Sequence, residues 1–359
     1  MRDINVLSCF DGSSCGQLAL KKLGIPIGAY YASEIDKYAI QVTQANFPNT
    51  IQVGDITKIN LYRFNHHIDL MIGGSPCQGF SFAGHQLNFD DPRSKLFFDF
   101  IRIRDVLLPK YVLLENVRMS KESQDVISKY MGCEPTKINS ALLSAQSRNR
   151  LYWFVQYDWD LGKYVPIHID QPQDKGIKLK DILEDLPFGE IPQYLANNWS
   201  GVPRGDRVKS IDDDKANCLT ASMYKGQIPT FVKKPNPTMS KEGLLHVGTA
   251  NLKGHDSIKR VYSEEGKSPT LTTMGGGHRE PKISMGDEYL WRKLTPLECE
   301  RLQTMPDNYT NHVSKTQRYK MIGNGWTVDV IAHILSQITL IEDSDTTWQE
   351  MYNKTKEMV

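Results

Sequence analysis

The first 155 residues alternate short apolar runs with amphipathic segments. Short apolar runs are typical of buried strands, and segments in which apolar residues recur every three or four positions are typical of helices. This pattern predicts strands at residues 4–8, 28–32, 69–72, 111–114 and 151–157, and helices at about 17–23, 36–46 and from Asp91-Pro92 onward. Strands that alternate with helices at this spacing favour an α/β fold, with a parallel sheet covered by helices on both faces.

The pattern changes after residue 157. Prolines, glycines and polar residues dominate 158–290, which predicts a second, smaller and loop-rich domain. Order returns at Thr295-Pro296-Leu297-Glu298, a capping box with proline at the first helical position, and a last helix is expected over about 328–340. We therefore expect a main domain at 1–157, the second domain at 158–290, a return to the main domain at 291–340 and a C-terminal tail at 341–359.

Composition narrows the class of protein. With 40% apolar and 24% charged residues the chain can bury a core, and no run approaches the roughly 20 apolar residues of a membrane span. We therefore expect a soluble, cytoplasmic protein with no membrane partner. The formal net charge is +1, but residues 220–284 carry ten basic and five acidic side chains, a balance compatible with either a phosphate-contacting face or solvated loops.

Cysteine usage points to one reactive thiol. The six cysteines have neither a C-x-x-C pair nor zinc-finger spacing with histidine, so we expect no metal site and no disulfide framework. Cys77 differs from the others, because it follows Pro76 just beyond a predicted strand end and precedes a glycine-containing loop. This context displays the thiol instead of burying it, and the thiolate would be a nucleophile.

Further polar residues follow the neighbouring strands. Glu115 comes directly after an apolar run, at the edge of the sheet where we expect Cys77, and could donate a proton there. Gln146-Ser147-Arg148-Asn149-Arg150 places two arginines at i, i+2 before another strand. Their guanidinium groups suit carbonyl or phosphate oxygens.

The loops after the first strands favour a nucleoside site. The first loop, Phe10-Asp11-Gly12-Ser13-Ser14-Cys15-Gly16, lacks the G-x-G-x-x-G pattern of pyrophosphate binding, but its glycines allow close approach of a ligand without phosphates. Glu34 follows the first loop at about the sequence separation at which an acidic residue binds the two ribose hydroxyls in dinucleotide-binding folds. Asp55 could accept a hydrogen bond from an exocyclic amine. Together these residues predict a site for a nucleoside with a small zwitterion attached.

Four short motifs resemble, in residue type, order and spacing, those of DNA (cytosine-5)-methyltransferases. They are Pro76-Cys77-Gln78, Glu115-Asn116-Val117, Gln146-x-Arg148-x-Arg150 and Ile322-Gly323-Asn324-Gly325. The first loop is most similar to that of phage and eukaryotic de novo members. The resemblance implies a Rossmann-like methyltransferase sheet, with 158–290 as the target-recognition domain. The sequence departs from the family at Gly325-Trp326, where members usually carry a small polar residue and then an aliphatic one.

By this resemblance the cofactor is S-adenosylmethionine. Phe10 would stack on the adenine side and Glu34 would hold the ribose hydroxyls. Asp55 would contact the adenine amine, and Asn324 would line the methionine end. The full set of implied cofactor residues is Phe10, Gly12, Gly16, Glu34, Ile35, Asp55, Ile56, Pro76 and Asn324.

The same resemblance implies a covalent mechanism on double-stranded DNA. Cys77 would add to C6 of a cytosine flipped out of the duplex, and Glu115 would bind N3 and the amino group. Arg150 would hold the O2 carbonyl, with Arg148 as a further catalytic candidate. The residues expected to contact DNA are Gln78, Ser81, Arg93, Thr220 and Thr272.

Other functions stay open at this point. A branch of the same family methylates transfer RNA, but the long 158–290 region favours DNA because it leaves room for a sequence-reading lobe. A catalytically silent DNA-binding regulator would not need Cys77, Glu115 and Arg150 together, and a nicotinamide-dependent oxidoreductase would need the missing glycine pattern. We expect a monomer in the cytoplasm or on the nucleoid, with a cognate restriction endonuclease as a candidate partner. The target site is not predicted.

Overall fold

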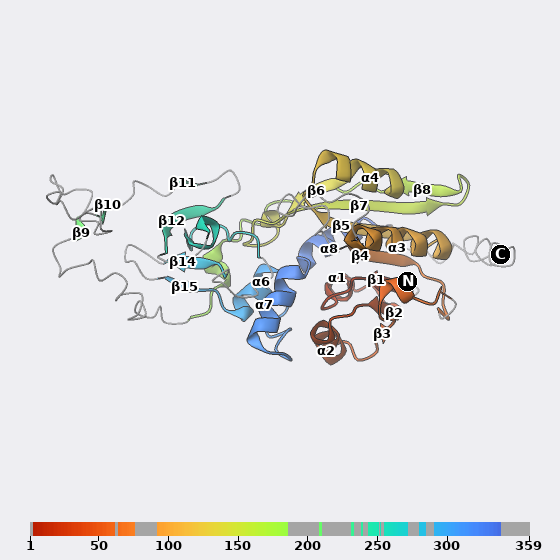
Figure 1. Cartoon of the computed structure of the whole chain (residues 1–359), viewed down its shortest axis with the longest axis horizontal. Helices are drawn as coiled ribbons and strands as arrows, with labels where there is room; N and C mark the ends of the chain where they lie inside the picture. The colour runs from red at the N-terminus through yellow and green to blue at the C-terminus, as the bar shows by residue number, and fades with distance from the viewer. Residues whose placement is uncertain are drawn as a thin grey trace.

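Figure 1 shows the computed structural model of the chain. It describes residues 3–61, 64–75, 92–185, 208–209, 231–232, 238–239, 243–250, 252, 255–271, 280–284 and 291–338. Only the backbone is described for residues 92–94, 208–209, 231–232, 238–239, 248–249 and 291–293.

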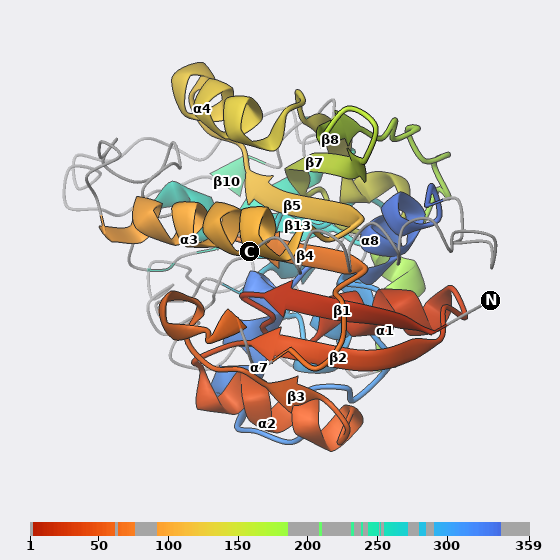
Figure 2. The same cartoon turned by 90° about the vertical axis from the view of Figure 1, so that its right-hand side faces the viewer.

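The main body is built on an eight-stranded sheet. Its strand order is β3-β2-β1-β4-β5-β7-β6, with β8 added to β7 (Figure 2). The strands are β1 Ile4–Cys9, β2 Ile27–Ser33, β3 Ile51–Gln52, β4 Leu70–Gly74, β5 Tyr111–Val117, β6 Thr136–Asn139, β7 Asn149–Asp158 and β8 Lys163–Pro166. The strand order reverses between β1 and β4, and ligands of α/β sheets bind at such a reversal, beyond the carboxyl ends of the strands.

The direction of the strands differs from the expectation at one edge. Strands β1 to β5 are parallel, but β7 is antiparallel to β5, and β6 and β8 are antiparallel to β7. The prediction of a parallel sheet is therefore wrong for β7, and β6 and β8 were not predicted as strands. A parallel connection needs a crossover of about a dozen residues or more. Only nine residues separate Asn139 of β6 from Asn149 of β7, and only four separate β7 from β8.

Helices cover both faces of the sheet. Successive strand residues point to opposite faces, so Val6 joins the core cluster that contains residues of α1 and α8, whereas Leu7 joins the cluster that contains residues of α3 and α4. The helices are α1 Cys15–Lys22, α2 Lys37–Asn46, α3 Pro92–Leu107, α4 Lys121–Met131, α6 Pro296–Leu302, α7 Lys315–Asn324 and α8 Val328–Leu335, with short 3-10 turns at Ile56–Lys58, Ser140–Leu142, Leu179–Ile182 and Asp256–Ile258. None of the helices in the described part of the chain has the length and apolar character that a membrane span requires.

The structure confirms the strands and helices expected in the first 155 residues, with their ends shifted by up to three positions. The sequence pattern missed β3, β6, β8, α4 and α7, and α8 ends at Leu335, before the expected residue 340. Helix α7 was missed because it is mostly polar, with Tyr319, Met321 and Ile322 as its buried apolar residues.

A smaller sheet lies apart from the main one, at the left of Figure 1. Its order is β11-β12-β13-β14-β15, and a separate pair joins β9 to β10. These strands are β9 Val208–Lys209, β10 Phe231–Val232, β11 Thr238–Met239, β12 Leu245–Thr249, β13 Arg260–Ser263, β14 Lys282–Ser284 and β15 Trp291–Lys293. The main sheet extends to Pro166, beyond the expected end of the main domain at residue 157. The smaller sheet includes β15, which begins one residue after the expected end of the second domain at residue 290.

The predicted capping box at the start of α6 is confirmed. Thr295 Oγ1 accepts from the backbone N–H of Glu298, and the Glu298 carboxylate accepts from the Thr295 N–H at 2.8 Å. The Thr295 hydroxyl also donates to the Glu184 carboxylate. This threonine therefore ties the start of α6 to the segment that follows the Leu179–Ile182 turn.

We expect Thr295→Ala to lower the free energy of unfolding by about 1–2 kcal/mol, because it removes an N-cap acceptor. The thermal unfolding midpoint measures this loss. Ser314→Ala is the matched control, since Ser314 is the N-cap residue of α7 but its side chain makes no capping hydrogen bond. Equal midpoints for the two variants would contradict the structural role of Thr295.

Candidate active site

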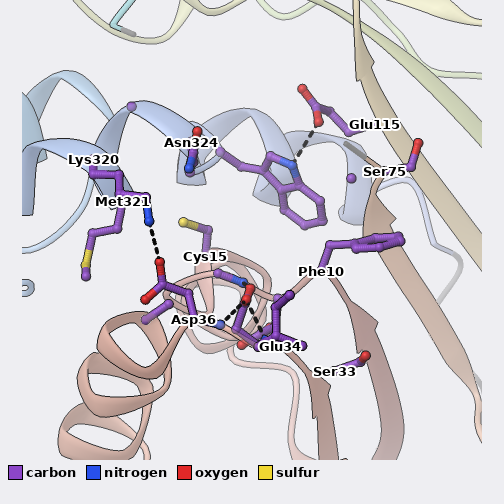
Figure 3. A pocket seen from close by; sticks show the side chains of 18 of the residues that line it. Phe10, Cys15, Ser33, Glu34, Asp36, Ser75, Glu115, Lys320, Met321 and Asn324 are labelled. Carbon is purple, nitrogen blue, oxygen red and sulfur yellow. Dashed lines mark hydrogen bonds and ion pairs between the residues drawn. The ribbon is translucent and has the colours of Figure 1, made fainter. Parts of the chain in front are cut away.

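A cavity of about 400 Å³ opens at the carboxyl ends of the central strands (Figure 3). This volume lies in the range of ligand pockets, roughly 300–1,000 Å³. The end of α7 and the turn after it close the cavity from the other side. Among its lining residues are ten that the sequence singled out: Phe10, Gly12, Glu34, Ile35, Asp55, Ile56, Glu115, Arg148, Arg150 and Asn324.

Glu34 follows β2 and is held by backbone donors. Its Oε2 accepts from the N–H of Gly12 at 2.8 Å, and its Oε1 accepts from the N–H groups of Ile35 and Asp36 at 2.7 and 2.8 Å. A carboxylate has about four acceptor positions, so one remains for a ligand hydroxyl. Ile35 beside it is 77% exposed, an unusual position for an isoleucine without a ligand.

Two glycines leave the cavity open beside Glu34. Gly12 and Gly54 have φ angles of +60° and +77°, and a Cβ at either position would have no heavy atom within 4 Å. Phe10 also has a positive φ, 58°, which an aromatic residue adopts only when its surroundings hold it there. The loop after β1 therefore presents backbone and one ring to the cavity.

Asp11 holds the loop after β1 in place through two hydrogen bonds. It accepts from the Tyr30 hydroxyl at 2.9 Å and from the Ser14 hydroxyl. Burial raises the pKa of the Asp11 carboxyl to about 6. Sequence reasoning did not select Asp11, although it lines the cavity.

Gly16 and Asp55 have structural tasks of their own. A Cβ on Gly16 would lie 2.2 Å from Ile72 Cδ1, so this glycine permits α1 to pack closely on β4, and it is not among the cavity-lining residues. Asp55 caps the turn that begins at Ile56, where its Oδ1 accepts from the N–H and hydroxyl of Thr57 at 3.0 and 2.9 Å. These hydrogen bonds lower the pKa of Asp55.

Glu115 and Arg150 form an ion pair at the other end of the cavity. Arg150 Nε lies 3.0 Å from Glu115 Oε1, and the two side chains are 14% and 10% exposed. The second carboxylate oxygen, Oε2, accepts from Trp326 Nε1 at 3.0 Å. In Figure 3 Glu115 lies at the top right and Glu34 at the bottom centre, with the cavity between them. Sequence reasoning noted Trp326 only as a departure from the family and gave it no role.

Arg148 has different partners from Arg150. It is 3% exposed and donates to the carbonyls of Leu271, Gly323 and Gly325 at 2.9 to 3.2 Å. Burial lowers the pKa of Arg148 to about 9, so the guanidinium stays protonated at neutral pH. Its donors thus hold the C-terminal end of α7 in place.

Several lining residues come from α7 and were missed with that helix. Lys320 Nζ lies 2.7 Å from Asp36 Oδ2, so the pair links α7 to the N-cap of α2 across one side of the cavity (Figure 3).

Asn116 was quoted in a motif but not selected as a site residue. Its Nδ2 donates to Ser75 Oγ at 3.0 Å, which anchors the chain just before Pro76.

The remaining expected site residues lie outside the described part of the chain. These are Pro76, Cys77, Gln78, Ser81, Thr220 and Thr272, together with the side chain of Arg93. Of the cysteines that the structure describes, Cys9, Cys15 and Cys299 are buried and Cys133 is half-buried. Burial raises the pKa of Cys15 and Cys133 to about 11 and that of the other two thiols as well, which makes all four poor nucleophiles. No group of three or more His, Cys, Asp or Glu residues suited to a metal occurs among the described residues.

Comparison with known proteins places this site in a family. The family of C-5 cytosine-specific DNA methylases matches residues 4–340. The orphan methyltransferase M.SPBetaI of Bacillus phage SPbeta is 28% identical over 94% of this chain and 98% of its own. The type II methyltransferase M.HhaI of Haemophilus parahaemolyticus is also 28% identical, over 93% of this chain and 94% of its own.

Solved structures show the same fold. The Entamoeba histolytica methyltransferase EhMeth has a TM-score of 0.59 at 18% identity, covering 94% of this chain and 98% of its own. The Dnmt2 methyltransferase of S. pombe has a TM-score of 0.56 at 16% identity, with coverages of 93% and 97%. From the match over residues 4–340, the chain belongs to the family of C-5 cytosine-specific DNA methylases, which use S-adenosylmethionine as the methyl donor.

Proposed function

We propose that this protein, a DNA (cytosine-5)-methyltransferase by its family, holds the methyl donor and the target base in one continuous cavity. The observation that carries the proposal is that Glu34 and Phe10 line the same cavity as the Glu115–Arg150 ion pair.

The residues near Glu34 fit S-adenosylmethionine. The Glu34 carboxylate accepts from a ribose hydroxyl at its remaining acceptor position, Phe10 stacks on the adenine, and Asp55 accepts from its amine. Ile35 and Ile56 supply apolar contact, Gly12 and Gly54 leave space for the nucleoside, and Asn324 lines the methionine end. The open space at both glycines and the acceptor position left on Glu34 support this assignment. When bound, S-adenosylmethionine supplies an electrophilic methyl group.

The residues near Glu115 act on the base. The Cys77 thiolate adds to C6 of cytosine, and the electron pair displaced toward N3 is met by a proton held by Glu115. Arg150 donates to the O2 carbonyl, which gains negative charge as the adduct forms. C5 is thereby made nucleophilic enough to take up the methyl group. N3 then returns its proton to Glu115 and solvent takes the C5 proton. The C5–H electrons form the C5=C6 double bond, and the electrons of the S–C6 bond return to the Cys77 sulfur.

The depth of the ion pair supports base flipping. Because Glu115 and Arg150 are 10% and 14% exposed, a cytosine stacked inside a duplex could not reach them. The target base therefore leaves the helix, and Gln78, Ser81 and Arg93 contact the backbone or bases around it. Thr220 and Thr272 contact DNA from the target-recognition region at 158–290. Arg148 acts through the turn that it holds and not on the base.

Partners beyond DNA stay predictions. One relative is named a type II methyltransferase and another an orphan methyltransferase. A cognate restriction endonuclease acting on the same site, a monomeric state and a cytoplasmic or nucleoid location are therefore expectations for this chain.

The decisive experiment offers duplex DNA and transfer RNA side by side with radiolabelled S-adenosylmethionine. We expect label in duplex DNA alone, located at C5 of cytosine after hydrolysis to nucleosides. Label in RNA alone would overturn the proposal.

Cys77→Ser should abolish methylation and leave duplex binding intact, because a hydroxyl is a far weaker nucleophile than a thiolate at neutral pH. In the unmodified protein, 5-fluorocytosine at the target position should trap a covalent complex, since fluorine cannot leave as a proton does. Gel mobility under denaturing conditions measures the adduct. Methylation by the Cys77→Ser variant would exclude the covalent route.

Glu34→Gln should weaken S-adenosylmethionine binding about tenfold or more, the usual effect of losing hydrogen bonds to a charged acceptor. Isothermal titration calorimetry measures the dissociation constant. Glu122→Gln, an exposed position on α4, is the matched control and should bind normally. Equal affinity in both variants would remove Glu34 from the cofactor site.

A further inference from the structure

Trp326 occupies a position where the family usually carries an aliphatic residue. It follows α7 directly, between the C-cap Gly325 and the N-cap Thr327 of α8. Its indole N–H donates to Glu115 Oε2 at 3.0 Å across 211 residues of sequence. An aliphatic side chain could not make this bond, so the substitution adds a hydrogen-bond donor to the base end of the cavity.

The indole adds a second donor to Glu115. Arg150 Nε donates to Oε1 and Trp326 Nε1 donates to Oε2, so each carboxylate oxygen has one donor from the part of the chain that the structure describes. A carboxylate offers about four acceptor positions, which leaves one on each oxygen. With a proton on one of them, the two positions match a base that presents N3 as an acceptor and an amino group as a donor side by side.

Gly74 provides the space that this arrangement needs. It lies opposite Glu115 in the pairing of β4 with β5. A Cβ on Gly74 would lie 2.9 Å from Trp326 Nε1 and 3.0 Å from Glu115 Oε2, closer than real Cβ contacts. No left-handed φ is involved at this residue, so steric room is the reason for the glycine. The close approach of indole and carboxylate thus depends on a third position in another strand.

The backbone on both sides of Trp326 is fixed. The Gly325 carbonyl accepts from Arg148 Nη2 at 2.9 Å and from Gln303 Nε2 at 3.1 Å. The Thr327 hydroxyl donates to Gln303 Oε1 at 2.8 Å. Because the preceding and following residues are held this way, the indole reaches Glu115 from a rigid turn.

We propose that Trp326 is a positioning residue for Glu115. Its indole N–H, together with Arg150, holds the carboxyl group so that its two remaining positions, one to donate a proton to N3 and one to accept from the amino group, face the base before the base arrives. Such preorganisation spares the protein a reorientation of Glu115 during the reaction. This inference rests on the proposed role of Glu115 in binding N3 and the amino group of cytosine.

The primary test is Trp326→Phe, which keeps an aromatic ring and removes the donor. We expect the single-turnover rate of methylation to fall about tenfold or more, the range for losing a hydrogen bond to a charged group. Affinities for S-adenosylmethionine and duplex DNA, measured by calorimetry, should change less than about twofold, since the lost bond goes to Glu115 and not to either ligand. Trp159→Phe, the same change in the turn between β7 and β8, should leave all three values unchanged.

A second measurement is made without S-adenosylmethionine. The thiolate addition and the proton transfers can proceed without it, so the protein should exchange the C5 hydrogen of the target cytosine with solvent in its absence. We expect Trp326→Phe to slow this exchange by the same factor as methylation. A loss that appears only as weaker S-adenosylmethionine binding, with normal exchange, would overturn the proposal.

Gly74→Ala tests the same hydrogen bond with the indole present. The added methyl group should push the indole from the carboxylate and lower the single-turnover rate. In Trp326→Phe the clash is smaller, because the ring lacks Nε1. The single-turnover rate of the double variant should therefore fall by a smaller factor than the product of the two single-variant factors. Multiplicative losses, or a Trp326→Phe rate equal to that of the unmodified protein, would overturn the positioning role. Absence of methylation by the unmodified protein would instead refute the proposed function itself.

Discussion

The pairing of β5 with β7 is the constraint on which the base end of the cavity depends. Because the two strands are antiparallel, with Val117 opposite Arg150, the guanidinium reaches the Glu115 carboxylate from the neighbouring strand at 3.0 Å. Removing either partner would leave a largely buried charge unpaired, which is strongly destabilising. The antiparallel direction of β7, which the sequence pattern did not predict, therefore brings together two motifs that lie 35 positions apart in the chain.

A buried arginine organises the other wall. Four hydrogen bonds from Arg148 to backbone carbonyls offset the cost of burying its guanidinium group. Two of the carbonyls belong to Gly323 and Gly325, on either side of Asn324. The third belongs to Leu271, in a segment that also pairs with residues 145–147. One side chain thus connects the C-terminal end of α7, the turn that carries Trp326, and a segment of the region expected to recognise DNA.

The sequence predicted the parts of this site that follow strands, and for a physical reason. Phe10, Glu34 and Glu115 come directly after apolar runs, and the carboxyl ends of parallel strands meet at one edge of the sheet. Asp55 follows β3, which the sequence pattern missed, and was selected from the turn Gly54-Asp55-Ile56. Local hydrogen bonding also made the capping box at Thr295 recognisable. Strand direction at the β7 edge was not predictable, because an apolar run has the same pattern in both directions. Trp326 could not be assigned either, since its partner is 211 residues away and the helix before it, α7, has too few apolar residues to be recognised.

The glycines that end β4 have separate steric reasons. A Cβ on Gly73 would lie 2.7 Å from the ring of Phe100, which is fully buried in α3, and 3.2 Å from the carbonyl of Cys9. A Cβ on Gly74 would meet the indole and carboxylate on the opposite face. Neither face of β4 can therefore carry a side chain at its end. Ser75, the next residue, accepts from Asn116, the neighbour of Glu115. Ser75, two residues before Cys77, is thus fixed against the strand that carries Glu115, and such a fixed point is what the proposed nucleophile and proton donor would need in order to act on one base.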